Sequence, residues 1–170
     1  MLKITGLYKV FNYGTVNEKI ALRNVNLELE EGDFVTLIGG NGAGKSTLLN
    51  CIAGGYMAEK GSIIIDGIDV TKLPEYRRAS MLGRVFQDPM MGTAADMNIE
   101  ENLALAYRRG QRRTLKWGIG NKERAIYREL LKQLELGLEN RLGDKVGLLS
   151  GGQRQALTLL MATLKKPRLL

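Results

Sequence analysis

A glycine-rich run at residues 39–47 constrains this chain more than any other feature. It fits the pattern G-x-x-x-x-G-K-[ST], in which glycines let backbone amides approach phosphate oxygens. The apolar run 34–38 before it predicts a buried strand, and Leu48 and Ile52 behind it have helical spacing. Strand, loop and helix in this order predict a phosphate-binding loop at a helix start, within an α/β fold.

The residues of this loop are expected to bind different parts of a nucleotide–Mg²⁺ complex. Lys45 is expected to reach the terminal phosphates, and the Ser46 hydroxyl to coordinate Mg²⁺. The N-terminal end of the helix adds partial positive charge. The residues expected to bind the nucleotide here are Gly39, Gly40, Asn41, Gly42, Ala43, Gly44, Lys45, Ser46 and Thr47.

A second glycine-rich helix start lies near the end of the sequence. Ser150 is a favourable N-cap, and Gly151, Gly152 and Gln153 follow it before the apolar helical segment 156–164. One nucleotide does not need two such helix ends from one protomer. We therefore expect two copies, related by a two-fold axis, each to lend one end to the other's nucleotide.

The run Leu149-Ser150-Gly151-Gly152-Gln153, placed after a phosphate-binding loop, resembles the signature motif of the ATP-binding cassette (ABC) family. The resemblance covers residues 2–170 and implies a P-loop NTPase, with a RecA-like core, an antiparallel β subdomain and an inserted helical subdomain. It implies one nucleotide-binding domain over 1–170, with its core at 1–87, its helical subdomain at 88–152 and a return to the core at 153–170.

The resemblance assigns two further residues. Gln87, at the end of a strand predicted over 83–87, matches the Q-loop glutamine that contacts Mg²⁺ and the attacking water. Phe11 matches the aromatic residue that stacks on adenine, with Tyr13 as the alternative. Stacking needs only a ring face, and packing inside the protein stays open as the other explanation for both rings.

The family mechanism implies ATP and Mg²⁺ as cofactors and ATP hydrolysis that drives solute transport. The implied partners are a second nucleotide-binding domain, transmembrane permease subunits and an extracytoplasmic solute-binding protein, with the chain on the cytoplasmic face of the cell membrane. The run 87–105 is similar to cassettes of amino-acid or related small-solute importers.

Two alternatives belong to other functional classes. One is a soluble ABC ATPase that acts on DNA or ribosomes, and the other is a nucleotide-binding fragment without catalysis. Only 62 residues lie between Gln87 and Ser150, without sustained heptads, which excludes the DNA-repair type with its long coiled coil. The ribosome-acting type, with tandem cassettes, stays open.

The last residues, Lys165 to Leu170, match the entry into the strand that carries the Walker B motif in the family. That strand ends in Asp-Glu, and the glutamate serves as general base. We therefore expect the chain to be cut before Walker B, and we expect residues 1–170 to bind ATP without hydrolysing it alone.

Composition narrows the chemistry. The chain has no histidine and one cysteine, Cys51, which argues against zinc sites and against Ser-His or Cys-His catalysis. The net charge of +7 has a focus at 108–117. The basic residues of this segment, 108–116, are compatible with a solvated loop or a contact with membrane or permease. Nucleic-acid binding is not expected, because only Trp117 offers a stacking surface there.

The remaining patterns predict secondary structure. Alternation predicts strands at 2–8 and 25–29, and an apolar run predicts another at 62–65. Asn98 and Glu101 have the spacing of a capping box. Asn121 is expected to cap a second helix of the helical subdomain, whose predicted apolar face comprises Ile126, Leu130, Leu131 and Leu134.

Overall fold

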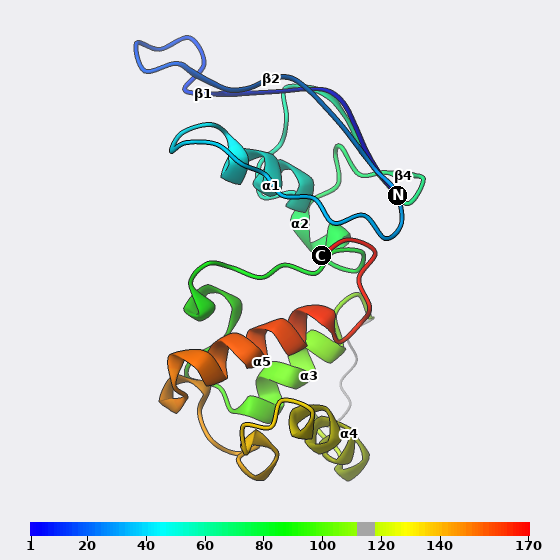
Figure 1. Cartoon of the computed structure of the whole chain (residues 1–170), viewed down its shortest axis with the longest axis vertical. Helices are drawn as coiled ribbons and strands as arrows, with labels where there is room; N and C mark the ends of the chain where they lie inside the picture. The colour runs from blue at the N-terminus through cyan, green and yellow to red at the C-terminus, as the bar shows by residue number, and fades with distance from the viewer. Residues whose placement is uncertain (112–117) are drawn as a thin grey trace. The chain divides into compact units, whose positions relative to one another are not determined.

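The computed structural model describes residues 1–111 and 118–170 (Figure 1). Contacts divide the chain into two compact units, each considered by itself. The first unit comprises Met1–Leu82 with Leu169, and the second comprises Gly83–Arg168 with Leu170. Residues 153–168 group with the second unit, whereas the sequence assigned them to the core. The functional division at 87 and 152 stays a prediction.

The first unit contains a four-stranded sheet in the order β2-β1-β3-β4, with every neighbouring pair antiparallel. This confirms the expected antiparallel β subdomain. Its first two strands are longer than the predicted 2–8 and 25–29. The elements are β1 (Leu2–Phe11), β2 (Lys19–Leu29), α1 (Lys45–Ala53), β3 (Lys60–Ile65), β4 (Ile68–Asp69) and α2 (Glu75–Arg78).

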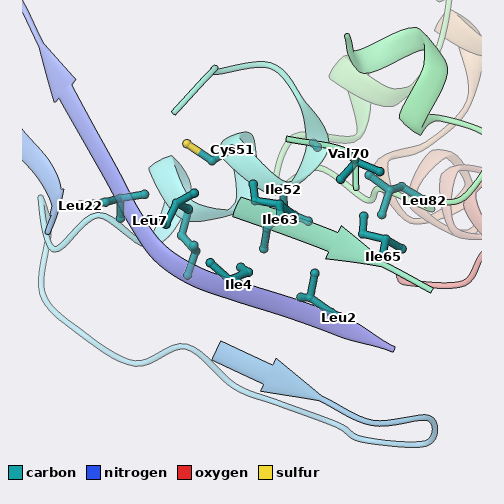
Figure 2. Packing of buried hydrophobic residues seen from close by; sticks show 12 residues of the cluster. Leu2, Ile4, Leu7, Leu22, Cys51, Ile52, Ile63, Ile65, Val70 and Leu82 are labelled. Carbon is teal, nitrogen blue, oxygen red and sulfur yellow. The ribbon is translucent and has the colours of Figure 1, made fainter. Parts of the chain in front are cut away.

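The core of the first unit follows from strand alternation. Leu2 and Ile4 are buried while Lys3 between them is exposed, because successive side chains of a strand point to opposite faces. Figure 2 shows these side chains meeting those of β3 and of α1. Cys51 is fully buried in this cluster, and burial raises the pKa of its thiol, which fits a small core residue rather than a nucleophile.

The strand expected at 34–38 is not formed. In the described parts of the chain no neighbouring strand pairs with it, and Phe34 and Ile38 are 95% and 92% exposed. The strand expected over 83–87 is also absent, and only Leu82, just before it, forms a parallel bridge, with Leu169. An apolar β-branched run becomes a buried strand only when neighbours complete its hydrogen bonds and cover its faces.

Arg78, at the end of α2, is completely buried without a carboxylate partner among the described residues. Its guanidinium donates instead to backbone carbonyls, and burial lowers its pKa. Two of the acceptors, Cys51 O at 2.7 Å and Ile52 O at 3.0 Å, belong to the last turn of α1. The others are Leu73 O at 2.7 Å and Thr71 O at 3.0 Å. Arg78 therefore holds the C-terminal end of the helix that follows the phosphate-binding loop.

The second unit is helical. Its elements are the 3₁₀ turn η1 (Pro89–Gly92), α3 (Ile99–Tyr107), α4 (Asn121–Lys132), the 3₁₀ turns η2 (Leu138–Asn140) and η3 (Val146–Leu148), and α5 (Gly151–Thr163). The capping box at the start of α3 is confirmed, with Asn98 N donating to Glu101 Oε2 at 2.7 Å. Buried Asn102 in α3 ties down the preceding segment by accepting from Ala94 N at 2.8 Å and donating to Ala94 O at 3.1 Å.

Two details of α4 differ from the prediction. The N-cap is Gly120 rather than Asn121. The Gly120 amide donates a hydrogen bond to the Glu123 carboxylate at 3.0 Å, which closes the first turn of α4. Leu131 is buried and Leu130 and Leu134 pack against the same core, as predicted, whereas Ile126 is exposed and buried Tyr127 contributes to this face. Burial of the Tyr127 ring raises its pKa to about 12.

The basic segment begins with two arginines that are both held by the second unit. Arg108 pairs with Glu123 at 2.8 Å, and Arg109 Nη2 donates to Ala162 O at 3.3 Å. Burial lowers the pKa of Arg109. A solvated loop therefore does not describe these two residues, and residues 112–117 lie outside the described part of the chain.

We expect Arg78→Met to destabilise the chain strongly. Methionine keeps the bulk of the side chain but leaves buried carbonyls without donors, at about 1–3 kcal/mol for each unsatisfied group. Urea unfolding of the full chain measures the change, with exposed Arg77→Met as the matched control. Equal unfolding midpoints for the two variants would contradict the role given to Arg78.

Candidate functional site

The phosphate-binding loop runs directly into α1, as the sequence predicted. Gly44 is the N-cap, with φ of 86°, a left-handed conformation that favours glycine. A Cβ at this position would lie 2.5 Å from Ala21 O of β2, so a side chain is excluded by space as well. The position where α1 begins is therefore set by close contact with β2.

Lys45 is the first residue of α1, and its ammonium lies back across the loop. Lys45 Nζ donates to Gly39 O at 2.7 Å and to Gly40 O at 2.8 Å. An ammonium has three donors, so these two bonds leave one for an anion. The two carbonyls hold the ammonium against the loop, and the first-turn amides of α1 that follow lack intrahelical acceptors.

Ser46 is exposed on the first turn of α1, next to Lys45. Among residues 1–111 and 118–170, no group of three or more His, Cys, Asp or Glu side chains could hold a metal ion. Mg²⁺ commonly takes one or two protein oxygens together with substrate phosphates and water. An exposed hydroxyl at a phosphate-binding loop fits that donor set, which keeps Ser46 as the candidate ligand.

The second glycine-rich motif forms a capped helix start. Ser150 Oγ accepts from Gln153 N at 3.3 Å, and Gln153 Oε1 accepts from Ser150 N at 3.2 Å. This reciprocal pair is a capping box. The sequence analysis predicted only the N-cap at Ser150, although the S-x-x-Q spacing also indicates the box. The side chains of the motif thus fix the start of α5.

Gly151 and Gly152 are exposed at the start of α5. A Cβ on either would meet nothing within 4 Å in the described parts of the chain. Glycine in a helix costs about 0.5–1 kcal/mol relative to alanine. Packing among the described residues therefore does not require glycine at either position, and their predicted role in nucleotide binding stays a prediction.

Arg154 fixes the segment before this helix start, a role that the sequence analysis missed. Its guanidinium donates to Val146 O at 3.3 Å, Gly147 O at 3.0 Å and Leu149 O at 3.2 Å. It also contacts the sulfur of Met90 in η1. Its position directly after the motif was visible in the sequence, but its carbonyl partners depend on tertiary structure.

Gln87 lies in the second unit, on an exposed bend rather than at a strand end. The turn after it is fixed, because Asp88 Oδ1 accepts from Met90 N at 2.9 Å and caps η1. The phosphate-binding loop belongs to the first unit, so the role of Gln87 toward Mg²⁺ and water stays a prediction.

Phe11 ends β1 and packs within the first unit. Its ring meets Tyr56 edge to face at 5.3 Å between centroids, and Lys9 Nζ lies 5.3 Å from its centroid. Tyr13, in the turn that follows, is 82% exposed. Contacts with Tyr56 and Lys9 thus cover part of the Phe11 ring. Whether Phe11 or Tyr13 stacks on adenine stays open.

In the described residues, no helix has the length and apolarity needed to cross a bilayer.

Comparison with known proteins gives the same assignment as the two motifs. The family model described as ABC transporter matches residues 22–170. The chain belongs to the ABC transporter family. Within that family it is similar to a tyrosine transport ATP-binding protein of Clostridioides difficile, with 42% identity over 172 residues. The match covers 100% of this chain and 67% of that relative.

A second relative is much longer than this chain. The ABC multidrug transporter mdr1 of Aspergillus fumigatus is 33% identical over 160 residues, which is 94% of this chain but 12% of that protein. The chain therefore spans about two thirds of the length of the bacterial relative and a small part of the fungal one.

Solved ABC cassettes share the fold. One, a dimer in a post-hydrolysis state bound to ADP and Pi, has a TM-score of 0.80 at 32% identity, covering 98% of this chain and 71% of that one. Another, in an ADP conformation, has a TM-score of 0.75 at 27% identity, covering 98% and 65%. The expected P-loop NTPase fold of an ABC cassette is confirmed.

We expect Phe11→Ala to weaken Mg-ATP binding by about 1–3 kcal/mol if the adenine stacks there, and Phe11→Tyr to have little effect. Inorganic tripolyphosphate separates stacking from general damage, because it has no base and its affinity would stay unchanged. Calorimetry on Phe11→Ala and Tyr13→Ala measures both ligands. Loss of ATP affinity in Tyr13→Ala alone would move the adenine site to Tyr13.

Proposed function

We propose that this chain is the nucleotide-binding part of an ABC transporter ATPase that serves a small, amino-acid-like solute. The observation that carries the proposal is the loop at 39–47, where Lys45 Nζ is bonded to the Gly39 and Gly40 carbonyls directly before the exposed start of α1; this supports an anion site there. The tyrosine transport protein among its relatives supports an amino-acid-like solute. Import is the direction proposed.

In the proposed mechanism, Lys45 and the first-turn amides of α1 bind and orient the phosphates of ATP. Bound Mg²⁺, held in part by the Ser46 hydroxyl, would offset charge on the transferred phosphoryl group. Gln87 positions the attacking water, and as a neutral amide it cannot take the proton itself. We assign no general base among residues 1–170, and hydrolysis is proposed for the whole protein.

The proposed partner at the nucleotide is a second copy of the cassette. Its helix start at Ser150, Gly151 and Gly152 would face the γ-phosphate held by the first copy's loop. The open space around both glycines supports this, because a backbone without Cβ atoms allows close approach. The related cassette that is dimeric in its ADP-bound and Pi-bound state agrees with such an assembly.

The remaining partners are proposed from family membership. They are transmembrane permease subunits, with the cassette at the cytoplasmic face of the membrane, and an extracytoplasmic solute-binding protein. A soluble ABC ATPase is the second candidate. The DNA-repair type is disfavoured because α3 and α4 have 9 and 12 residues, far short of a long coiled coil.

We expect Lys45→Ala to lower Mg-ATP affinity by about 2–4 kcal/mol, because the phosphates lose their nearest cation. Calorimetry on the folded chain measures the affinity. Exposed Lys72→Ala is the matched control, since it removes the same charge from the same unit. Unchanged affinity in Lys45→Ala would refute the assignment of the phosphate-binding loop.

We also expect Gly151→Asp to abolish ATP-dependent dimers of the full-length protein whose general base has been disabled. The added carboxylate would face the partner's γ-phosphate, and the two negative charges repel. Gly143→Asp is the control, because Gly143 is exposed and equally open but lies outside the motif. Sedimentation that finds ATP-dependent dimers of Gly151→Asp would remove the motif from the interface.

A further inference from the structure

Lys19 brings a second ammonium group to the phosphate-binding loop from outside the motif. It is the first residue of β2, and the register of the sheet pairs it with Phe11 of β1. A Cβ built on Gly42, in the middle of the loop, would lie 3.6 Å from Lys19 Nζ. The β1–β2 hairpin therefore carries this cation to the loop backbone, on the strand that also contacts Gly44 through Ala21.

The charge of Lys19 is not neutralised by a carboxylate in the described parts of the chain. Two other lysines of the sheet are paired, Lys3 with Glu28 at 3.2 Å and Lys9 with Glu59 at 2.7 Å. The acid adjacent to Lys19 is engaged elsewhere, because Glu18 Oε2 accepts from Gly14 N at 2.8 Å.

The charge of Lys19, unpaired among the described residues, lies beside the same loop that Lys45 contacts. Lys19 and Lys45 both bring ammonium groups to the same short loop, Lys19 beside Gly42 and Lys45 on the carbonyls of Gly39 and Gly40. A polyphosphate carries enough negative charge to interact with both.

We propose that Lys19 is a phosphate-contacting residue that selects nucleotides by the charge of their phosphate chain. This rests on the proposed ATP site and deepens it. Lys19 is paired with Phe11 in the sheet register and its ammonium lies beside Gly42, so it adjoins both a ring predicted to stack on adenine and the loop predicted to bind the phosphates. A flexible lysine acts there as a point charge rather than a geometric clamp.

The test compares nucleotide affinities of the folded chain by calorimetry. We expect Lys19→Ala to weaken Mg-ATP binding about tenfold, the size expected for one hydrogen bond to a charged group, to weaken ADP binding less, and to weaken AMP binding least. Lys19→Arg retains a cation and is expected to bind ATP within about threefold of the natural chain.

Arg23→Ala is the matched control. Arg23 is exposed on the same strand, and its removal changes the net charge equally without removing an ammonium group beside Gly42. Thermal unfolding without nucleotide serves as a second readout, because truncating an exposed side chain leaves the midpoint nearly unchanged. High salt is expected to narrow the difference between Lys19→Ala and the natural chain.

The outcomes separate this inference from the proposed function. If Lys45→Ala loses ATP binding while Lys19→Ala binds as the natural chain does, Lys19 has no phosphate contact and the proposed ATP site stands. Equal losses for ATP, ADP and AMP in Lys19→Ala would also overturn the inference, because they show no dependence on phosphate charge. A natural chain that binds no nucleotide would remove both proposals.

Discussion

The close approach of β2 to the phosphate-binding loop is the contact on which the rest of the nucleotide site depends. Ala21 O lies where a side chain at Gly44 would be, so the loop turns into α1 directly against the strand. The first turn of α1 then presents its amides and Lys45, while Arg78 holds the carbonyls of its last turn. The helix is fixed at both ends by residues distant in sequence.

The same contact also relates the two expected parts of the ligand site in the first unit, the aromatic ring for adenine and the loop for the phosphates. β2 is paired with β1, and β1 ends at Phe11, whose ring is held by Tyr56 and Lys9. The separation between an aromatic ring at the strand end and the phosphate loop is therefore set by sheet register. A one-residue slip in register would move every side chain of a strand to the opposite face and expose the buried residues of β1. Burial of those residues therefore also fixes the distance between the ring and the loop.

Local signals explain most of what the sequence predicted correctly. The loop and the start of α1, the capping box at Asn98 and the N-cap at Ser150 each depend on residues that are close in sequence. The antiparallel strands follow from alternation, which is also local. These features fixed the kind of fold and the positions of both glycine motifs before any tertiary contact was known.

The failures and omissions involve partners far apart in the chain. Residues 34–38 have the composition of a buried strand, but burial depends on neighbouring strands that the described residues do not provide. Arg78, Asn102 and Arg154 bind backbone carbonyls, which have no sequence signature. Lys19 was missed for a related reason, since its place beside Gly42 depends on hairpin register rather than on a motif.

The two glycine motifs differ in what requires their glycines. Glycine at position 44 is required by the fold of the chain itself, because the backbone is left-handed there and a Cβ would clash with Ala21 O. Gly151 and Gly152 have open space around them, although their helix start is fixed by the Ser150–Gln153 capping box and by Arg154 on the preceding segment. A helix start that is rigid but uncovered loses little conformational entropy when a charged group docks on it. These properties of the α5 helix start support the proposal that it docks on an anion held by a second copy, as sharing of ATP between two copies requires.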